Sequence, residues 1–147
     1  MAPRQFMRKM KVGKTGYKEA YKSVSEYKRL YPQKAVTFFA QQYPQYGWAI
    51  LMAGGSLPNI PVKDVKFLTD AAKMYVIAND GGDDSYDILG NPDVGYIVYT
   101  HNDREQKVAA SPGKYNIYAI DKSNGTMKIL EKKISITSAH TIPQINS

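Results

Sequence analysis

The spacing of apolar residues along the chain changes near its middle. Between Tyr17 and Tyr31 the apolar side chains recur at helical spacing, which predicts one amphipathic helix with a single apolar stripe. Thr15 is the predicted N-cap, and Pro32 ends the helix because its ring cannot continue the hydrogen-bond ladder. The stripe consists of Tyr17, Tyr21, Val24, Tyr27 and Tyr31.

Two further apolar runs follow this helix. Residues 34–40 (KAVTFFA) are β-branched and aromatic, which predicts a buried strand. The run Trp48–Ala53 is the longest apolar run of the chain, and it fits either a short buried helix or a buried strand. The glycine pair Gly54–Gly55 ends it in both cases, and Pro58 and Pro61 then hold the chain extended.

Strand and turn patterns dominate the second half of the chain. Residues 63–70 fit one helical turn or a strand, while residues 80–93 contain turn residues that bracket a long excursion. Residues 121–125 (DKSNG) predict a tight hairpin, and residues 137–147 are expected to form a fraying tail. Four strands are predicted, at residues 73–79, 96–100, 114–121 and 127–136.

This order of elements predicts an α+β fold, in which an N-terminal helical segment precedes a small antiparallel β-sandwich. Residues 1–16 form a basic arm, and residues 17–61 a helix–strand–helix segment. Residues 62–136 form the sandwich-like domain, and residues 137–147 the tail. The 147 residues suffice for one ordinary core and are too few for two full domains.

The net positive charge of the chain lies in its N-terminal arm and first predicted helix. Residues 1–34 hold ten Lys and Arg against two acids, a balance of +8, whereas residues 35–147 hold ten against eleven, a balance of −1. There is no cysteine, which excludes a disulfide framework and a Cys-ligated zinc. No apolar run approaches the roughly 20 residues of a membrane span, and no secretory signal peptide is visible.

The run WAILMAGGS at residues 48–56 resembles a W-A-x-x-M-A-G-G signature near the end of the (β/α)8 barrel in some bacterial glycoside hydrolases. The strand-rich part that follows is similar to the small C-terminal β-sandwich of those proteins. There, strands like residues 74–78, 95–99 and 113–121 follow one another, with an Asn124–Gly125 turn before the closing strand. The resemblance covers residues 31–136.

The resemblance implies that the chain is the C-terminal, non-catalytic part of a glycoside-hydrolase-like protein. Such enzymes use two carboxylates on different barrel strands, but residues 35–42 carry none where the family would offer one. The parent protein would then be the hydrolase, with its catalytic carboxylates upstream, and no catalytic residue is expected in this chain. The resemblance also implies a bacterial protein that is extracellular or periplasmic. Its expected ligand is carbohydrate, and its expected protein contact is an upstream catalytic region or an oligomer partner.

Aromatic and acidic residues give two candidate sites. Tyr43, Tyr46 and Trp48 are candidates for a platform on which a sugar ring stacks. A core position beside Met52 is the favoured interpretation of Trp48, so Tyr43 and Tyr46 are the better ligand candidates. No cofactor is expected, with calcium as the one alternative, because carboxylates gather in a glycine-containing loop whose spacing differs from an EF-hand. These carboxylates belong to Asp80, Asp83, Asp84 and Asp87.

The basic N-terminus supports an alternative from another functional class, a free-standing small binding protein for nucleic acid or anionic polysaccharide. The same charges fit a solubilising helix face equally well. Neither a phosphate loop nor a nucleophile elbow is present, so His101, Asp103 and Ser111 are not interpreted as a catalytic triad. The candidate polyanion-binding residues are Arg4, Arg8, Lys9, Lys11, Lys14, Lys18 and Lys22.

The two hypotheses make different structural predictions. A part of a larger protein should leave apolar side chains of the Tyr17–Tyr31 stripe or of the Trp48–Ala53 run available for contact with more protein. A free-standing polyanion-binding protein should have a closed core and an affinity that falls steeply with salt. We favour the first because the break in charge and composition lies where a domain boundary is expected.

Overall fold

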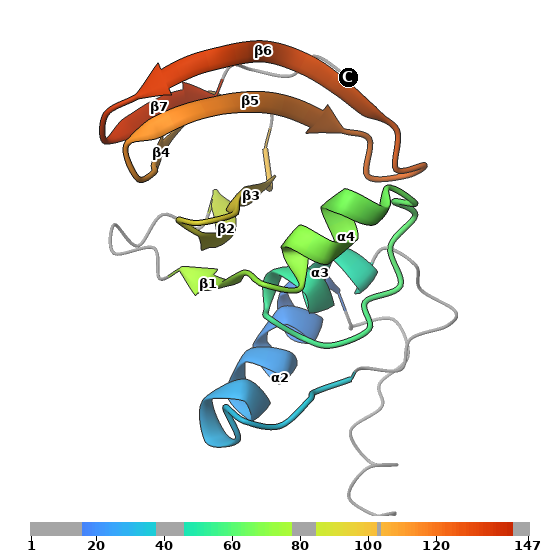
Figure 1. The fold of residues 1–147 in the computed structure, drawn as a ribbon. Helices are drawn as coiled ribbons and strands as arrows, with labels where there is room; N and C mark the ends of the chain where they lie inside the picture. The colour runs from blue at the N-terminus through green and yellow to red at the C-terminus, as the bar shows by residue number, and fades with distance from the viewer. Residues whose placement is uncertain (1–15, 38–45, 78–84, 103, 143–147) are drawn as a thin grey trace, which may run out of the picture. The chain divides into compact units, whose positions relative to one another are not determined.

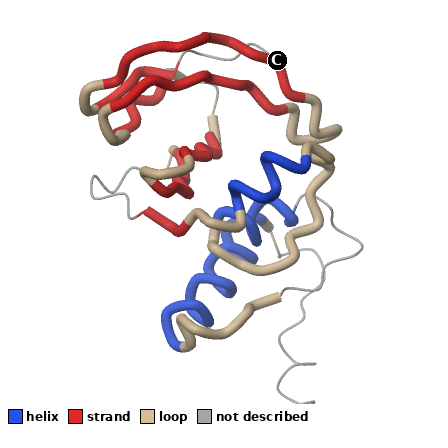
Figure 2. The backbone as a smooth tube through the Cα atoms, in the orientation of Figure 1, coloured by secondary structure: helices blue, strands red, loops and turns tan. Residues whose placement is uncertain are grey.

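The computed structural model describes residues 16–37, 46–77, 85–102 and 104–142 (Figure 1). The chain forms two compact units, Met1–Asn59 and Ile60–Ser147. All described helices precede the first described strand along the chain (Figure 2). Every strand pairing is antiparallel, so the predicted α+β class, with a small sandwich-like β region after the helices, is confirmed.

Helix α2 spans Tyr17–Leu30, as the apolar stripe predicts. Its cap differs from the prediction, because Gly16 occupies the N-cap position instead of Thr15. The Gly16 amide donates a hydrogen bond of 2.9 Å to the carboxylate of Glu19, which satisfies one backbone donor at the helix start. The last turn carries Lys28 and Arg29, whose charges suit the partial negative charge of a helix C-terminus.

Helix α3 spans Tyr46–Met52, so the longest apolar run is a short helix and all seven of its residues are buried. The glycine pair ends it in a Schellman motif. Gly54, at φ +77°, donates to the Leu51 carbonyl, and Gly55 donates to the Ile50 carbonyl at 2.8 Å. Glycine adopts this left-handed backbone conformation without steric cost because it has no Cβ.

Small side chains allow α2 and α3 to approach closely. Ala20 and Ala49 are fully buried and pack with Tyr46. A second cluster joins Val24 with Ile50 and Ala53, and Val36 packs against it.

The predicted strand at residues 34–40 does not form in its described part, where residue 34 lies in a bend and residues 35–37 have no regular secondary structure. The Val36 carbonyl instead accepts a hydrogen bond of 2.7 Å from the Ser56 amide, directly after α3. Residues 38–40 lie outside the described residues. In the described part of this run, Val36 therefore packs against the α2–α3 pair instead of joining a sheet.

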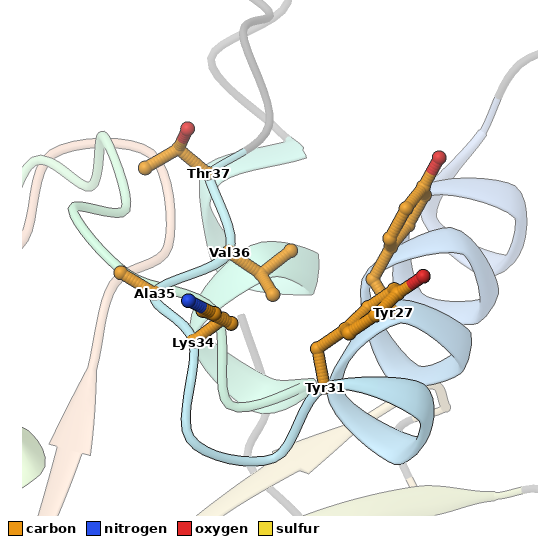
Figure 3. Close-up of a pocket in the computed structure, with 6 residues that line it drawn as sticks. All are labelled: Tyr27, Tyr31, Lys34, Ala35, Val36 and Thr37. Atoms are coloured by element: carbon orange, nitrogen blue, oxygen red, sulfur yellow. The ribbon is translucent and has the colours of Figure 1, made fainter.

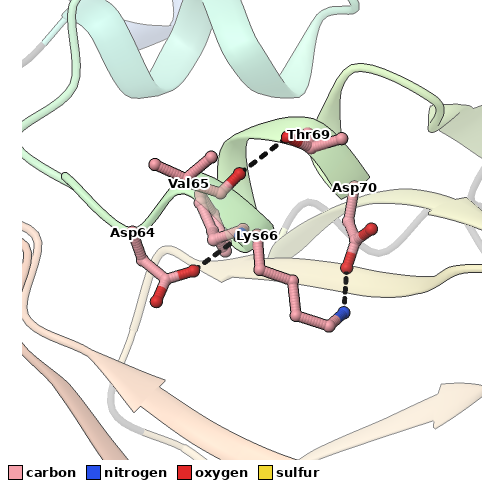
Figure 4. A network of polar contacts seen from close by, with 6 residues as sticks. Asp64, Val65, Lys66, Thr69 and Asp70 are labelled. Atoms are coloured by element: carbon pink, nitrogen blue, oxygen red, sulfur yellow. Dashed lines mark hydrogen bonds and ion pairs between the residues drawn. The ribbon is translucent and has the colours of Figure 1, made fainter.

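Helix α4 spans Val65–Ala71, so the segment at residues 63–70 contains a helix and not a strand. The Asp64 carboxylate caps it by accepting from the Phe67 amide at 2.7 Å (Figure 4). Thr69 donates to the Val65 carbonyl at 2.8 Å, and Lys66 forms an ion pair with Asp70 one turn further on. These local contacts account for a short helix that period alone did not distinguish from a strand.

The first sheet has the order β1–β2–β3, with β1 at Tyr75–Ile77, β2 at Tyr86–Asn91 and β3 at Gly95–Thr100. Strands β1 and β3 were predicted, whereas β2 lies inside the expected excursion. Gly90 of β2 lies against the Tyr96 ring of β3, so no larger residue fits there without a shift. Asn91 accepts from the Asp93 amide and closes the short β2–β3 turn.

Two further strand pairs complete the second unit. Strand β4 (Gln106–Ala109) pairs with β7 (Ala139–Ile142), so part of the expected tail is a strand. Strand β5 (Gly113–Ile120) pairs with β6 (Met127–Ile136), and this hairpin curves in Figure 1. Register shifts interrupt the β5–β6 pairing, as expected of β-bulges, which bend strands.

The predicted hairpin turn at residues 121–125 is present. Gly125, at φ +77°, donates to the Asp121 carbonyl at 2.8 Å, and Asp121 donates to Thr126 at 2.9 Å. The Asp121 carboxylate accepts from the hydroxyl and amide of Ser123, and these hydrogen bonds lower the pKa of Asp121 below its usual value. The charged carboxylate thus organises the turn.

Side-chain hydrogen bonds connect the strand pairs within the second unit. Tyr96 of β3 donates to the Ser111 hydroxyl at 2.9 Å, and Tyr115 of β5 donates to the Ser111 carbonyl. Burial is the main cause that raises the pKa of the Tyr115 hydroxyl, and the nearby Tyr96 raises it further. Ser85, just before β2, donates to buried Gln106 of β4 at 2.8 Å. Within the described ranges, no helix combines the length and apolar character of a membrane span.

Replacing Gly55 with alanine should destabilise the helix pair. The new Cβ would lie 2.6 Å from Cγ2 of Ile50, 2.9 Å from its carbonyl oxygen and 3.1 Å from Cγ1 of Val24. We expect a loss of about 1–3 kcal/mol in the free energy of unfolding, measured by denaturant unfolding. Gly113→Ala is the control, because its Cβ would meet atoms only at 3.5 Å or beyond. Equal stability of Gly55→Ala and the original protein would contradict this packing.

Candidate functional site

A groove of about 330 Å³ lies at the C-terminal end of α2 in the first unit (Figure 3). Tyr27 of α2 and its C-cap residue Tyr31 form one side, and residues 34–37, which follow the helix, form the other side. The Val36 side chain points toward the tyrosine side. The lining residues are Tyr27, Tyr31, Lys34, Ala35, Val36 and Thr37.

Both tyrosines are open to solvent. Tyr27 is 58% exposed and Tyr31 is 54% exposed, and the neighbouring Leu30 is 57% exposed. Tyr27 lies in the last turn of α2 and Tyr31 is its C-cap residue, and Figure 3 shows both side chains on the same side of the groove. Two large aromatic rings are therefore presented together beside a hollow in the surface.

Backbone hydrogen bonds fix the extended wall of the groove. The Lys34 amide donates to the Tyr31 carbonyl at 3.0 Å, which closes the turn after α2. The Lys28 ammonium donates to the carbonyls of Pro32 and Lys34, at 3.4 and 3.2 Å. The hydrogen bond from Ser56 to Val36 ties the same wall to the end of α3. The groove is thus held by contacts that do not depend on a ligand.

The lining chemistry is aromatic, apolar and cationic. Tyr27 and Tyr31 provide ring faces and hydroxyls, Val36 provides an apolar wall, and Thr37 provides a hydroxyl. Lys34 supplies the one ionic charge among the lining residues, and no carboxylate is among them. Such a surface can hold a ring with apolar CH groups and polar substituents, but its six lining residues do not provide the pair of carboxylates that glycoside hydrolysis uses.

The predicted sugar platform lies elsewhere in the first unit. Tyr46 and Trp48 belong to α3 and are 6% and 5% exposed, so their rings are covered. This burial fits the favoured interpretation that Trp48 fills the core. Tyr43, the third predicted residue, lies outside the described residues.

The groove tyrosines were present in the sequence only as members of the apolar stripe. Ala20 and Val24 face α3 and are buried, whereas the end of the stripe extends past the short α3 partner. The sequence signal that could have indicated exposed tyrosines is a difference in length. The apolar stripe runs over four helical turns, whereas the apolar run that follows covers fewer than two.

The predicted polyanion-binding residues are only partly described. Lys18 and Lys22 are exposed on α2, one turn apart, near its N-terminal end. The other five residues lie outside the described residues: Arg4, Arg8, Lys9, Lys11 and Lys14. Their grouping with α2 into one basic surface stays a prediction.

The predicted calcium loop is also only partly described. Asp87 lies on β2, and its carboxylate is 2.9 Å from Nε2 of His101. Asp80, Asp83 and Asp84 lie outside the described residues. In the part of the chain that the structure describes, no three His, Asp or Glu side chains form a group that could hold a metal ion.

The described members of the His101, Asp103 and Ser111 set have other partners. His101 is paired with Asp87, whereas Ser111 binds Tyr96, and Asp103 lies outside the described residues. A different serine, Ser85, lies opposite His101 in the β2–β3 ladder, but its hydroxyl donates to Gln106.

A family model described as a domain of unknown function, DUF6298, matches residues 1–74, which is half of the 147-residue chain. The chain belongs to the DUF6298 family. Comparisons with curated proteins and with solved structures found no match. The DUF6298 match contains α2, α3, α4 and all six groove residues, and it ends just before β1. Nothing in these comparisons connects DUF6298 with glycoside hydrolases.

Proposed function

We propose that this chain is the C-terminal, non-catalytic part of a glycoside-hydrolase-like protein and that it contributes a carbohydrate-binding surface. The observation that carries the proposal is the groove at the end of α2, where Tyr27 and Tyr31 are each more than half exposed. The resemblance of residues 48–56 to a barrel-end signature supports the glycosidase part of the proposal.

An aromatic groove suits a sugar because one face of a pyranose carries CH groups that pack on a ring, while its hydroxyls need polar partners. Tyr27 and Tyr31 provide the rings, and Lys34 and Thr37 provide polar groups at the wall. The volume of about 330 Å³ falls at the lower end of the roughly 300–1,000 Å³ typical of small-ligand sites. This size fits one or two sugar units better than a long segment.

The groove is proposed as a binding surface and not as an active centre. Hydrolysis of a glycoside requires two carboxylates at a fixed separation, and none of the six lining residues carries one. In this proposal, catalysis belongs to a part of the parent protein outside this chain, as the resemblance implies. The β-rich second unit then serves as a supporting domain.

Removing the two rings should weaken sugar binding. For Tyr27→Ala, Tyr31→Ala and the double variant, we expect each lost ring to cost about 0.5–1.5 kcal/mol, roughly two- to tenfold in Kd. Isothermal titration calorimetry with neutral and acidic oligosaccharides provides the measurement. Tyr75→Ala is the matched control, because Tyr75 is 55% exposed on β1, away from the groove residues in sequence.

Binding that survives the double Tyr27/Tyr31 variant would contradict the proposed site. Binding that disappears in Lys18→Gln/Lys22→Gln and falls steeply with salt would support the polyanion-binding alternative instead. Thermal unfolding of each variant separates a loss of contact from a loss of folding. Since both tyrosines are exposed, the variants should keep the original unfolding temperature within a few degrees.

The parent protein has a separate test, the intact mass of the native species in its source. We expect a mass several-fold above the 16.5 kDa of this chain, because a (β/α)8 barrel alone takes about 250 residues. A native species of 16.5 kDa would overturn the glycosidase part and leave the groove proposal to the binding experiment.

A further inference from the structure

We infer that the sugar ring held by the groove carries a carboxylate and that Lys34 is the residue that recognises it. This inference rests on the proposed function, since it names the ligand class of the same groove. Uronic acid units in a polysaccharide have this chemistry, with a pyranose ring that bears one negative charge.

Charge at the groove is of one sign. From Tyr27 to Thr37 the chain carries Lys28, Arg29 and Lys34 and no Asp or Glu. Among the lining residues, the Lys34 ammonium is the one ionic group. A carboxylate on the bound ring would complement this charge, whereas a neutral ring would gain no ionic contact from it.

The two nearby lysines have different tasks. Lys28 donates its hydrogen bonds to the Pro32 and Lys34 carbonyls, so its charge stabilises the C-terminal end of α2 and the turn that follows. Lys34 is held through its own backbone, because its amide donates to Tyr31 and its carbonyl accepts from Lys28. The backbone of Lys34 is therefore fixed, while its exposed side chain lines the groove.

The presence of one cation among the six lining residues favours a uronate over a nucleic acid as the ligand. A phosphate backbone is bound by several cations, each of which adds to the salt dependence of the affinity. Here the ring faces of Tyr27 and Tyr31 supply the area of contact, and Lys34 supplies a single charge contact. The predicted salt dependence is thus that of one ion pair.

Matched ligands that differ only in charge test the inference. The probes are oligogalacturonides and oligoglucuronides, each compared with its fully methyl-esterified and therefore neutral form. At low salt, we expect the acidic form to bind about three- to fivefold more tightly, the range of one partly exposed ion pair. Lys34→Gln should equalise the two forms, and Lys18→Gln, which removes an exposed charge at the other end of α2, should keep the preference.

Each outcome separates this inference from the proposed function. Equal affinity for acid and ester, with both weakened by Tyr27→Ala/Tyr31→Ala, would overturn the role of Lys34 and leave the carbohydrate groove in place. A preference for the acid that persists in Lys34→Gln, or that disappears in Lys18→Gln, would also overturn it. No binding of either form, or of the neutral oligosaccharides, would overturn the proposed function together with this inference.

Discussion

The close approach of α2 to the end of α3 is the constraint on which the first unit depends. Gly55 lies so close to Ile50 and Val24 that a methyl group has no place there. This approach requires the Schellman ending at Gly54, which turns the chain back along the helix pair. Because Ser56 follows directly, its amide reaches the Val36 carbonyl and fixes the wall of the groove.

The groove is a consequence of unequal helix lengths. Helix α2 has 14 residues and α3 has 7, so α3 covers the part of the apolar stripe around Ala20 and Val24. The end of the stripe is left to Tyr27 and Tyr31, whose rings tolerate exposure because their hydroxyls remain hydrated. One sequence pattern therefore supplies a core at one end and an accessible aromatic surface at the other.

The elements with a strong local signal were predictable from the sequence. Helix α2 has a regular period over four turns, and the β5–β6 hairpin has an Asn124–Gly125 turn. Strand β2 was missed because Gly90 and Asn91 look like turn residues, and only the Tyr96 ring beside Gly90 explains their place in a sheet. The short β4 and β7 pair over a long separation that no local pattern reveals. The groove was missed for a similar reason, since the sequence does not indicate which part of the Tyr17–Tyr31 apolar stripe is buried by another helix.

The central claim is that the end of α2 contacts sugar, and NMR of ring-labelled tyrosines tests it most directly. Oligosaccharides would be titrated into the protein while the ring signals of individual tyrosines are followed. The account predicts shifts for Tyr27 and Tyr31, with unchanged signals for Tyr75 and Tyr118, which are 55% and 49% exposed on the β-rich unit. Saturable shifts at Tyr75 or Tyr118 without any at Tyr27 and Tyr31 would contradict it.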